Sequence, residues 1–252
     1  MANLAGALST DGVRPSLPVR GKGDQRVYIR RCFCVGKNYA KHARELGCDP
    51  DKEPPVFFCK QAEDVFHARG ARESVPFPLS TEVLHHEVEL CAIIGREQPA
   101  GSGPIPRSEA MAYVGGWCTG LDMTRRDIQN EARRTGGPWD MSKSFPYAAP
   151  CSEVVPASEW PRDDWDIDPV AAMAGLRVTC DVNGEHRQEG VLGEMVWRVP
   201  DIIHYLSELT ELRPGDLIMT GTPEGVGPVL PGDSVCGKID GLPEVRIVYK
   251  SE

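Results

Sequence analysis

Two glutamates one residue apart open an apolar run, and this pair constrains the fold more than any other stretch of the chain. Glu87-Val88-Glu89 leads into five apolar residues, LCAII, at positions 90–94. Such a run is typical of a buried strand, and because side chains alternate between the two faces of a strand, Glu87 and Glu89 point the same way. Two like charges entering the interior destabilise a fold unless something neutralises them. A hard divalent cation with oxygen ligands is the simplest candidate.

A third carboxylate belongs with this pair. Asp122 ends a strand predicted over 112–122, directly before a helix predicted over 124–134. Thr124 and Asp127 would form a capping box at the start of this helix, and Gly136 would end it. With Glu87 and Glu89 it provides enough oxygen ligands for Mg²⁺ or Mn²⁺, leaving positions for water and substrate. From spacing alone a second interpretation stays open, in which Asp122 caps the helix and the glutamates pair with arginines.

Composition excludes several classes of protein. The 252 residues carry 28 Lys and Arg against 37 Asp and Glu, a formal charge of −9, which argues against binding to nucleic acid or to an anionic membrane. No apolar run reaches the roughly 18 to 20 residues of a membrane helix. The nine cysteines are scattered without a zinc-type spacing, which favours a reducing compartment. We expect a cytoplasmic protein, with a mitochondrial address as the alternative.

Further polar residues follow the predicted strand ends. Arg126 and Gln129 share a face of the 124–134 helix, where they suit a carboxylate and an oxyanion; a solvated helix face is the competing interpretation. Lys143 lies between aromatic residues and is either aimed at an anion or on the surface.

Two more segments can contribute to a site. His42 and Glu45 are three residues apart on a short predicted helix, so the histidine can act as a general base on water, although such pairs are also ordinary on surfaces. The loop at 221–227 offers the Gly221 backbone and the Thr222 hydroxyl to a carboxylate, and it lacks the Lys of a phosphate-binding loop.

Many short strands and few short helices predict a β-rich α+β fold, and Asn183-Gly184 predicts the turn of a β-hairpin. We expect a single domain over 1–252 with an extended N-terminal arm at 1–27. Five blocks in order are together similar to the fumarylacetoacetate hydrolase family, above all to its small acylpyruvate and fumarylpyruvate hydrolases. The blocks are VGKNYAKHARE (35–45), HHEVEL (85–90), GLDMTRRDIQ (120–129), PWDMSKSF (138–145) and the segment 214–227.

The resemblance implies a fold and roles for single residues. The fold would be a mixed β-roll with peripheral helices over 28–250, usually a homodimer, with a mobile lid at 38–55. The metal ligands would be Glu87, Glu89 and Asp122. The catalytic residues would be His42, Glu45, Lys143 and Gln129, and the substrate would also contact Arg126, Gly221 and Thr222.

The implied activity is hydrolysis of a carbon–carbon bond. The substrate would be a β-diketo acid of the acylpyruvate or fumarylpyruvate type, cleaved with Mg²⁺ or Mn²⁺ to pyruvate and a carboxylic acid. The alternative is an oxaloacetate decarboxylase, or a related 2-oxo acid lyase or isomerase that uses the same metal and enolate chemistry. The third hypothesis is a protein that binds a metal or a metabolite without catalysis. It requires that a metal ligand or the base be missing, and none of these residues is missing.

Overall fold

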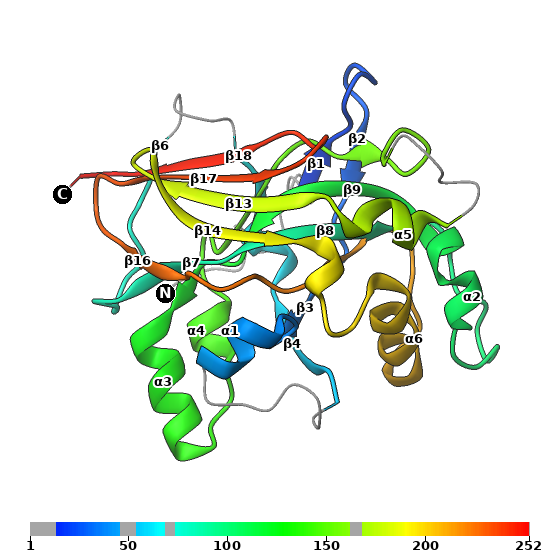
Figure 1. The fold of residues 1–252 in the computed structure, drawn as a ribbon, viewed down its shortest axis with the longest axis horizontal. Helices are drawn as coiled ribbons and strands as arrows, with labels where there is room; N and C mark the ends of the chain where they lie inside the picture. The colour runs from blue at the N-terminus through cyan, green and yellow to red at the C-terminus, as the bar shows by residue number, and fades with distance from the viewer. Residues whose placement is uncertain (1–13, 46–53, 69–73, 162–167, 252) are drawn as a thin grey trace, which may run out of the picture.

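Two large β-sheets packed on each other make up most of the computed structural model, which describes residues 14–45, 54–68, 74–161 and 168–251 (Figure 1). In order across the larger sheet, the strands are β4 (Val56–Lys60), β3 (Arg31–Gly36), β15 (Asp216–Met219), β8 (Val88–Ile94), β9 (Val114–Leu121), β11 (Ala149–Cys151) and β5 (Val65–His67), with β12 (Val155–Pro156) also paired to β9. The other large sheet has the order β14 (Glu185–Val191), β13 (Arg177–Val182), β17 (Ser234–Ile239), β18 (Val245–Tyr249) and β6 (Ser74–Val75).

Two small sheets complete the β structure of the described residues. One has the order β10 (Thr124–Arg125), β7 (Leu84–His86) and β16 (Gly227–Val229), and the other pairs β1 (Ser16–Pro18) with β2 (Arg26–Tyr28). In the larger sheet β15 runs parallel to β3 but antiparallel to β8, so the sheet is mixed. This β-rich α+β architecture, with a mixed curled sheet, confirms the predicted fold class.

The helices are short and lie at the periphery of the sheets (Figure 1). They are α1 (Ala40–Glu45), α2 (Arg107–Ala110), α3 (Arg126–Thr135), α4 (Asp140–Lys143), α5 (Pro169–Ala174) and α6 (Val199–Leu209), with 3₁₀ turns at Ala62–Asp64, Met111–Tyr113 and Leu192–Glu194. In the described part of the chain, none of these helices combines the length and the apolar character of a membrane span.

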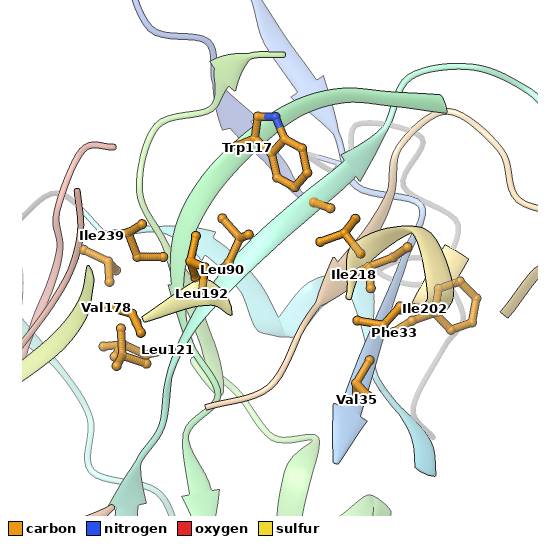
Figure 2. Close-up of a cluster of buried hydrophobic side chains, with 14 of the residues drawn as sticks. Phe33, Val35, Leu90, Trp117, Leu121, Val178, Leu192, Ile202, Ile218 and Ile239 are labelled. Atoms are coloured by element: carbon orange, nitrogen blue, oxygen red, sulfur yellow. The ribbon is translucent and has the colours of Figure 1, made fainter. Parts of the chain in front are cut away.

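Strand β8 explains the apolar run that follows the glutamates. All seven of its residues are buried, because β15 and β9 flank it in the larger sheet and the other large sheet covers it. Figure 2 shows Leu90 of β8 among core side chains that include Leu121 from β9 and Val178 and Ile239 from the other sheet. A strand covered on both faces must be apolar throughout, which is the pattern of positions 90–94.

The start of α3 differs from the sequence prediction. Thr124 with Asp127 was expected to form a capping box, but the helix begins at Arg126 and Thr124 belongs to β10. The Thr124 hydroxyl donates instead to the Asp122 carbonyl, 3.1 Å away, and Asp127 accepts from the Thr81 hydroxyl at 2.7 Å. The alternative in which Asp122 caps this helix is therefore wrong. The predicted end at Gly136 is confirmed by its left-handed backbone, with φ of 71°.

Parts of two predicted segments lie outside the described residues. Of the arm at 1–27, the structure describes the residues from 14 onward, which include the β1–β2 pair. Of the lid at 38–55, it describes 38–45 and 54–55. The mobility of the lid stays a prediction.

Candidate active site

The three carboxylates converge where two neighbouring strands end. Glu87 lies between β7 and β8, Glu89 is on β8, and Asp122 follows β9 directly. Pairing of β8 with β9 places the Asp122 amide 2.8 Å from the Glu87 carbonyl. One oxygen from each carboxylate lies within 4.8 Å of the others, and the three residues are 4%, 2% and 0% exposed. Glu87 and Glu89, two residues apart, and Asp122 at the end of the neighbouring strand therefore form a buried triad of acids.

Lys143, from the short helix α4, lies between two of these acids. Its Nζ donates to Glu87 Oε2 at 2.8 Å, to Asp122 Oδ2 at 2.6 Å and to the Thr124 hydroxyl at 2.7 Å. Burial lowers the pKa of Lys143, but the charges of Asp122 and Glu87 more than offset this, so that its pKa is raised. The lysine is therefore a buried cation with all three N–H groups used, and the surface position weighed from the sequence is wrong.

A second buried lysine, which sequence reasoning missed as a functional residue, completes the Asp122 environment. Lys60, at the end of β4, has its Nζ 2.7 Å from Asp122 Oδ1, an ion pair without hydrogen-bond alignment. The same Nζ donates to the Met123 carbonyl at 3.1 Å and to the Lys143 carbonyl. Lys60 therefore holds both the acid and the backbone of the neighbouring lysine. The only sequence signal was a lysine ending an apolar strand.

Arg126, the first residue of α3, covers the other side of Glu87. Its guanidinium donates to Glu87 Oε1 and to Gln129 Oε1, and its Nε donates to His85 Nδ1 at 3.3 Å. Because Gln129 accepts through its oxygen, its Nε2 amide is the end that remains to donate. Burial, followed by the charge of Arg126, lowers the pKa of His85 to about 4, so His85 is a neutral acceptor at physiological pH.

The two glutamates differ sharply in their compensation. Burial alone would raise the pKa of Glu87, but Lys143 and Arg126 hold it well below its usual range. Burial and then the charges of Asp122 and Glu87 raise the pKa of Glu89 well above its usual range. No cation among the described residues pairs with Glu89, whose Oε2 accepts only the Gly221 amide, at 2.7 Å. The predicted pairing of the glutamates with arginines is therefore found for Glu87 and not for Glu89.

Glu87→Gln is expected to lower the free energy of unfolding of the metal-free protein by about 3 kcal/mol, because it leaves the buried Lys143 and Arg126 short of negative charge. Urea unfolding after EDTA treatment measures this. The matched control is Glu131→Gln, which breaks an exposed pair with Arg134 and should change stability by less than about 0.5 kcal/mol. A Glu87→Gln variant as stable as this control would contradict the assignment.

The triad opens into a pocket of about 320 Å³ that includes space open to solvent. Its walls combine the acids and cations with the apolar side chains of Val35, Phe58 and Trp139. The ring centroids of Phe58 and Trp139 lie 5.6 Å apart. Eight of the ten residues predicted for the site line it: His42, Glu87, Glu89, Asp122, Arg126, Gln129, Lys143 and Thr222.

His42 reaches the pocket from α1, the helix predicted to carry it. His42 is 4% exposed and lines the same pocket as the three carboxylates, so its side chain is near the triad. Glu45 ends the same helix, but its side chain lies outside what the structure describes. The predicted contact between the two side chains therefore stays a prediction.

The loop after β15 contributes backbone as well as side chain. Gly221 has φ of +99°, and a Cβ on it would come within 2.7 Å of Asn38 Cβ, so only glycine fits. This conformation presents the Gly221 amide to Glu89. The predicted contact of Gly221 with substrate stays a prediction. The next residue, Thr222, is 2% exposed and lines the pocket.

Gln188 is the other residue that sequence reasoning missed. It is 0% exposed on β14, and its amide donates to the Thr222 hydroxyl at 2.8 Å. The local sequence, EHRQEG, is polar throughout, so its pattern gives no signal of which side chain turns inward.

The donor set fits a hard divalent cation. All three candidate ligands are carboxyl groups, they are close enough to share one ion, and no cation among the described residues pairs with Glu89. Such ligands suit Mg²⁺ or Mn²⁺ and not a soft metal.

Comparisons with known proteins match most of this chain. The family described as fumarylacetoacetate (FAA) hydrolase C-terminal matches residues 31–248. Oxaloacetate tautomerase FAHD1, mitochondrial, from Arabidopsis thaliana is 41% identical over 216 residues, covering 86% of this chain and 89% of that protein. The protein of the same name from Mus musculus is 40% identical over 221 residues, 88% and 92% of the two chains.

A solved structure extends the match to three dimensions. Fumarylpyruvate hydrolase from Pseudomonas aeruginosa, in complex with Mn²⁺ and pyruvate, superposes with a TM-score of 0.86 at 40% identity, covering 97% of this chain and 99% of that one. The family match spans most of the chain, and the fold follows over nearly all of it. The chain belongs to the fumarylacetoacetate hydrolase family.

Proposed function

We propose that the protein is a metal-dependent hydrolase that cleaves an acylpyruvate of the fumarylpyruvate type to pyruvate and a carboxylic acid. The observation that carries the proposal is the buried triad of Glu87, Glu89 and Asp122 in one pocket with His42 and the free amide end of Gln129. The similarity to a fumarylpyruvate hydrolase that binds Mn²⁺ and pyruvate supports it.

The triad would hold Mg²⁺ or Mn²⁺, which supplies Lewis-acid polarisation of the 2-oxo acid end of the substrate when bound. Lys60 and Lys143 balance the charge of Asp122, and Lys143 and Arg126 hold the pKa of the buried Glu87 well below its usual range. Arg126 and Thr222 line the pocket and would contact the substrate carboxylate. Lys143 contacts the substrate only if it gives up one of its three hydrogen bonds.

His42 would take a proton from a water molecule, with Glu45 holding the imidazole. The water oxygen adds to the acyl carbonyl carbon, and the Gln129 amide donates to the oxygen that becomes negative. The carbon–carbon bond then breaks, and its electron pair passes to the pyruvate fragment, which takes up a proton. The acyl fragment leaves as a carboxylic acid.

Keto–enol isomerisation of oxaloacetate is a second candidate, because the curated relatives reported above are named oxaloacetate tautomerases. It needs the same metal and carboxylate contacts but breaks no carbon–carbon bond. The two activities therefore differ in their products and not in the residues that bind the acid.

One preparation assayed side by side separates these candidates. With Mn²⁺, the protein is expected to release pyruvate from fumarylpyruvate or acetylpyruvate, and EDTA is expected to abolish the release. Loss of the enol absorbance of oxaloacetate without pyruvate, together with no release from either acylpyruvate, would favour the tautomerase. Pyruvate and CO₂ from oxaloacetate would indicate a decarboxylase. The homodimer and the cytoplasmic location stay predictions, for ultracentrifugation and cell fractionation to test.

A further inference from the structure

The buried Gln188 makes four hydrogen bonds from a strand that is otherwise mostly exposed. Its Oε1 accepts the Val88 amide at 3.2 Å and lies 2.8 Å from His86 Nδ1. Its Nε2 donates to the Thr222 hydroxyl at 2.8 Å and to the Pro223 carbonyl at 2.9 Å. One amide thus joins the strand carrying the glutamates to the loop that lines the pocket.

The backbone partners of Gln188 determine which end of its side-chain amide is the oxygen and which is the nitrogen. The Val88 N–H can only donate, so it requires the oxygen of Gln188, and the Pro223 carbonyl can only accept, so it requires the nitrogen. A flipped amide would lose both bonds in a buried place.

This orientation uses both hydrogens of the Gln188 amide. One goes to the Pro223 carbonyl, and the other goes to Thr222 Oγ1, which must accept it. The hydroxyl hydrogen of Thr222 is then left to be donated, and within the described ranges no hydrogen bond takes it. Because Thr222 lines the pocket, this hydrogen is available to a ligand there.

The loop packs closely against the strand that carries Gln188. Gly225 has φ of +87°, and a Cβ on it would lie 2.2 Å from the carbonyl oxygen of Arg187, so loop and strand are packed backbone to backbone. The orientation of the Gln188 amide also determines the tautomer of His86. Because Gln188 Oε1 can only accept, His86 Nδ1 must carry the hydrogen.

We propose that Gln188 is a positioning residue that makes the Thr222 hydroxyl an obligate hydrogen-bond donor, and that this donor recognises the carboxylate of the 2-oxo acid. The inference rests on the proposed function for the identity of the ligand. A hydroxyl held in this direction favours an acceptor such as a carboxylate and disfavours a ligand that presents an N–H or O–H group at that point.

The test measures the Kd of pyruvate for the Mn²⁺-loaded protein by calorimetry. Thr222→Val, which removes the donor, is expected to weaken binding about 10- to 100-fold, and Thr222→Ser is expected to bind within about threefold of wild type. Gln188→Glu keeps the shape, but its carboxylate accepts the Thr222 hydrogen and turns the oxygen lone pairs toward the pocket, so a loss of similar size is expected. In the Thr222→Val background the same substitution should have less than a threefold effect.

Two results would overturn the proposal. One is Thr222→Val binding pyruvate as wild type does, which stays decisive even where Gln188→Glu does not fold. The other is a Gln188→Glu loss equally large with and without the Thr222 hydroxyl, which would assign Gln188 to the fold alone.

A measurement without ligand separates this inference from the proposed function. Nitrogen-15 NMR of the metal-free protein should show His86 with its hydrogen on Nδ1, with the resonance assigned through a His86→Asn variant. The hydrogen on Nε2 would contradict the amide orientation. Wild-type protein that shows the Nδ1–H form but binds no pyruvate would count against the proposed function and leave the orientation intact.

Discussion

Glu89→Gln is expected to lower kcat for pyruvate release by about 10³-fold or more and to weaken Mn²⁺ binding, while leaving the metal-free protein nearly as stable as wild type. Glu89 pairs with no cation in the described part of the chain, and burial, followed by the charges of the neighbouring acids, raises its pKa. An uncharged amide of the same shape therefore removes a repulsion and keeps an acceptor for the Gly221 amide. We expect the free energy of unfolding to change by less than about 1 kcal/mol.

The contrast with Glu87→Gln makes this prediction specific. Both variants should lose activity, but only Glu87→Gln should lose stability, because Glu87 accepts from Lys143 and Arg126. Calorimetric titration with Mn²⁺, steady-state kinetics and urea unfolding in EDTA give the three readouts, and Glu131→Gln is the control. If Glu89→Gln bound Mn²⁺ as tightly as wild type, Glu89 would not be a ligand.

His42→Ala is expected to reduce pyruvate release from an acylpyruvate by about 10²-fold or more, because it removes the proposed base that activates water. The Kd values of Mn²⁺ and of pyruvate should change by less than about threefold, since the carboxylate triad and the Arg126 contact remain. The change should therefore appear in kcat and hardly in binding.

His186→Ala is the matched control for His42→Ala. His186 is exposed on β14 and lies 3.2 Å from Asp181, so its loss should leave kcat within about twofold of wild type. A His42→Ala enzyme with the wild-type rate would remove the base from the mechanism. A variant that lost Mn²⁺ binding instead would place His42 in the support of the triad.

Local sequence patterns predicted the elements whose causes are local. The apolar run after Glu89 became the buried strand β8, and Asn183-Gly184 became the turn between β13 and β14, where both residues have positive φ. Gly136 ended α3 as predicted. These features depend on burial and backbone preference within a few residues.

Long-range contacts account for what the sequence could not predict. Gln188 is joined to Val88 and His86 across about a hundred positions. Lys60 ends β4 and pairs with Asp122 after β9, although β3, β15 and β8 lie between these two strands in the sheet. Thr124 also had a plausible local role as a cap, but the hydroxyl receives a hydrogen bond from Lys143 in the folded chain. In each case a tertiary partner competed with the local preference and prevailed.

The row of alternating charges has a consequence for how the protein handles its ion. Each side chain in this row forms an ion pair with the next one, which has the opposite charge. The order is Lys60, Asp122, Lys143, Glu87 and Arg126. The chain can therefore reach its folded state before any ion arrives, in contrast to small metalloproteins in which folding and ion binding are one event. We expect a divalent ion to be an exchangeable component of this folded scaffold, so that its removal would stop catalysis and leave the fold in place for reloading.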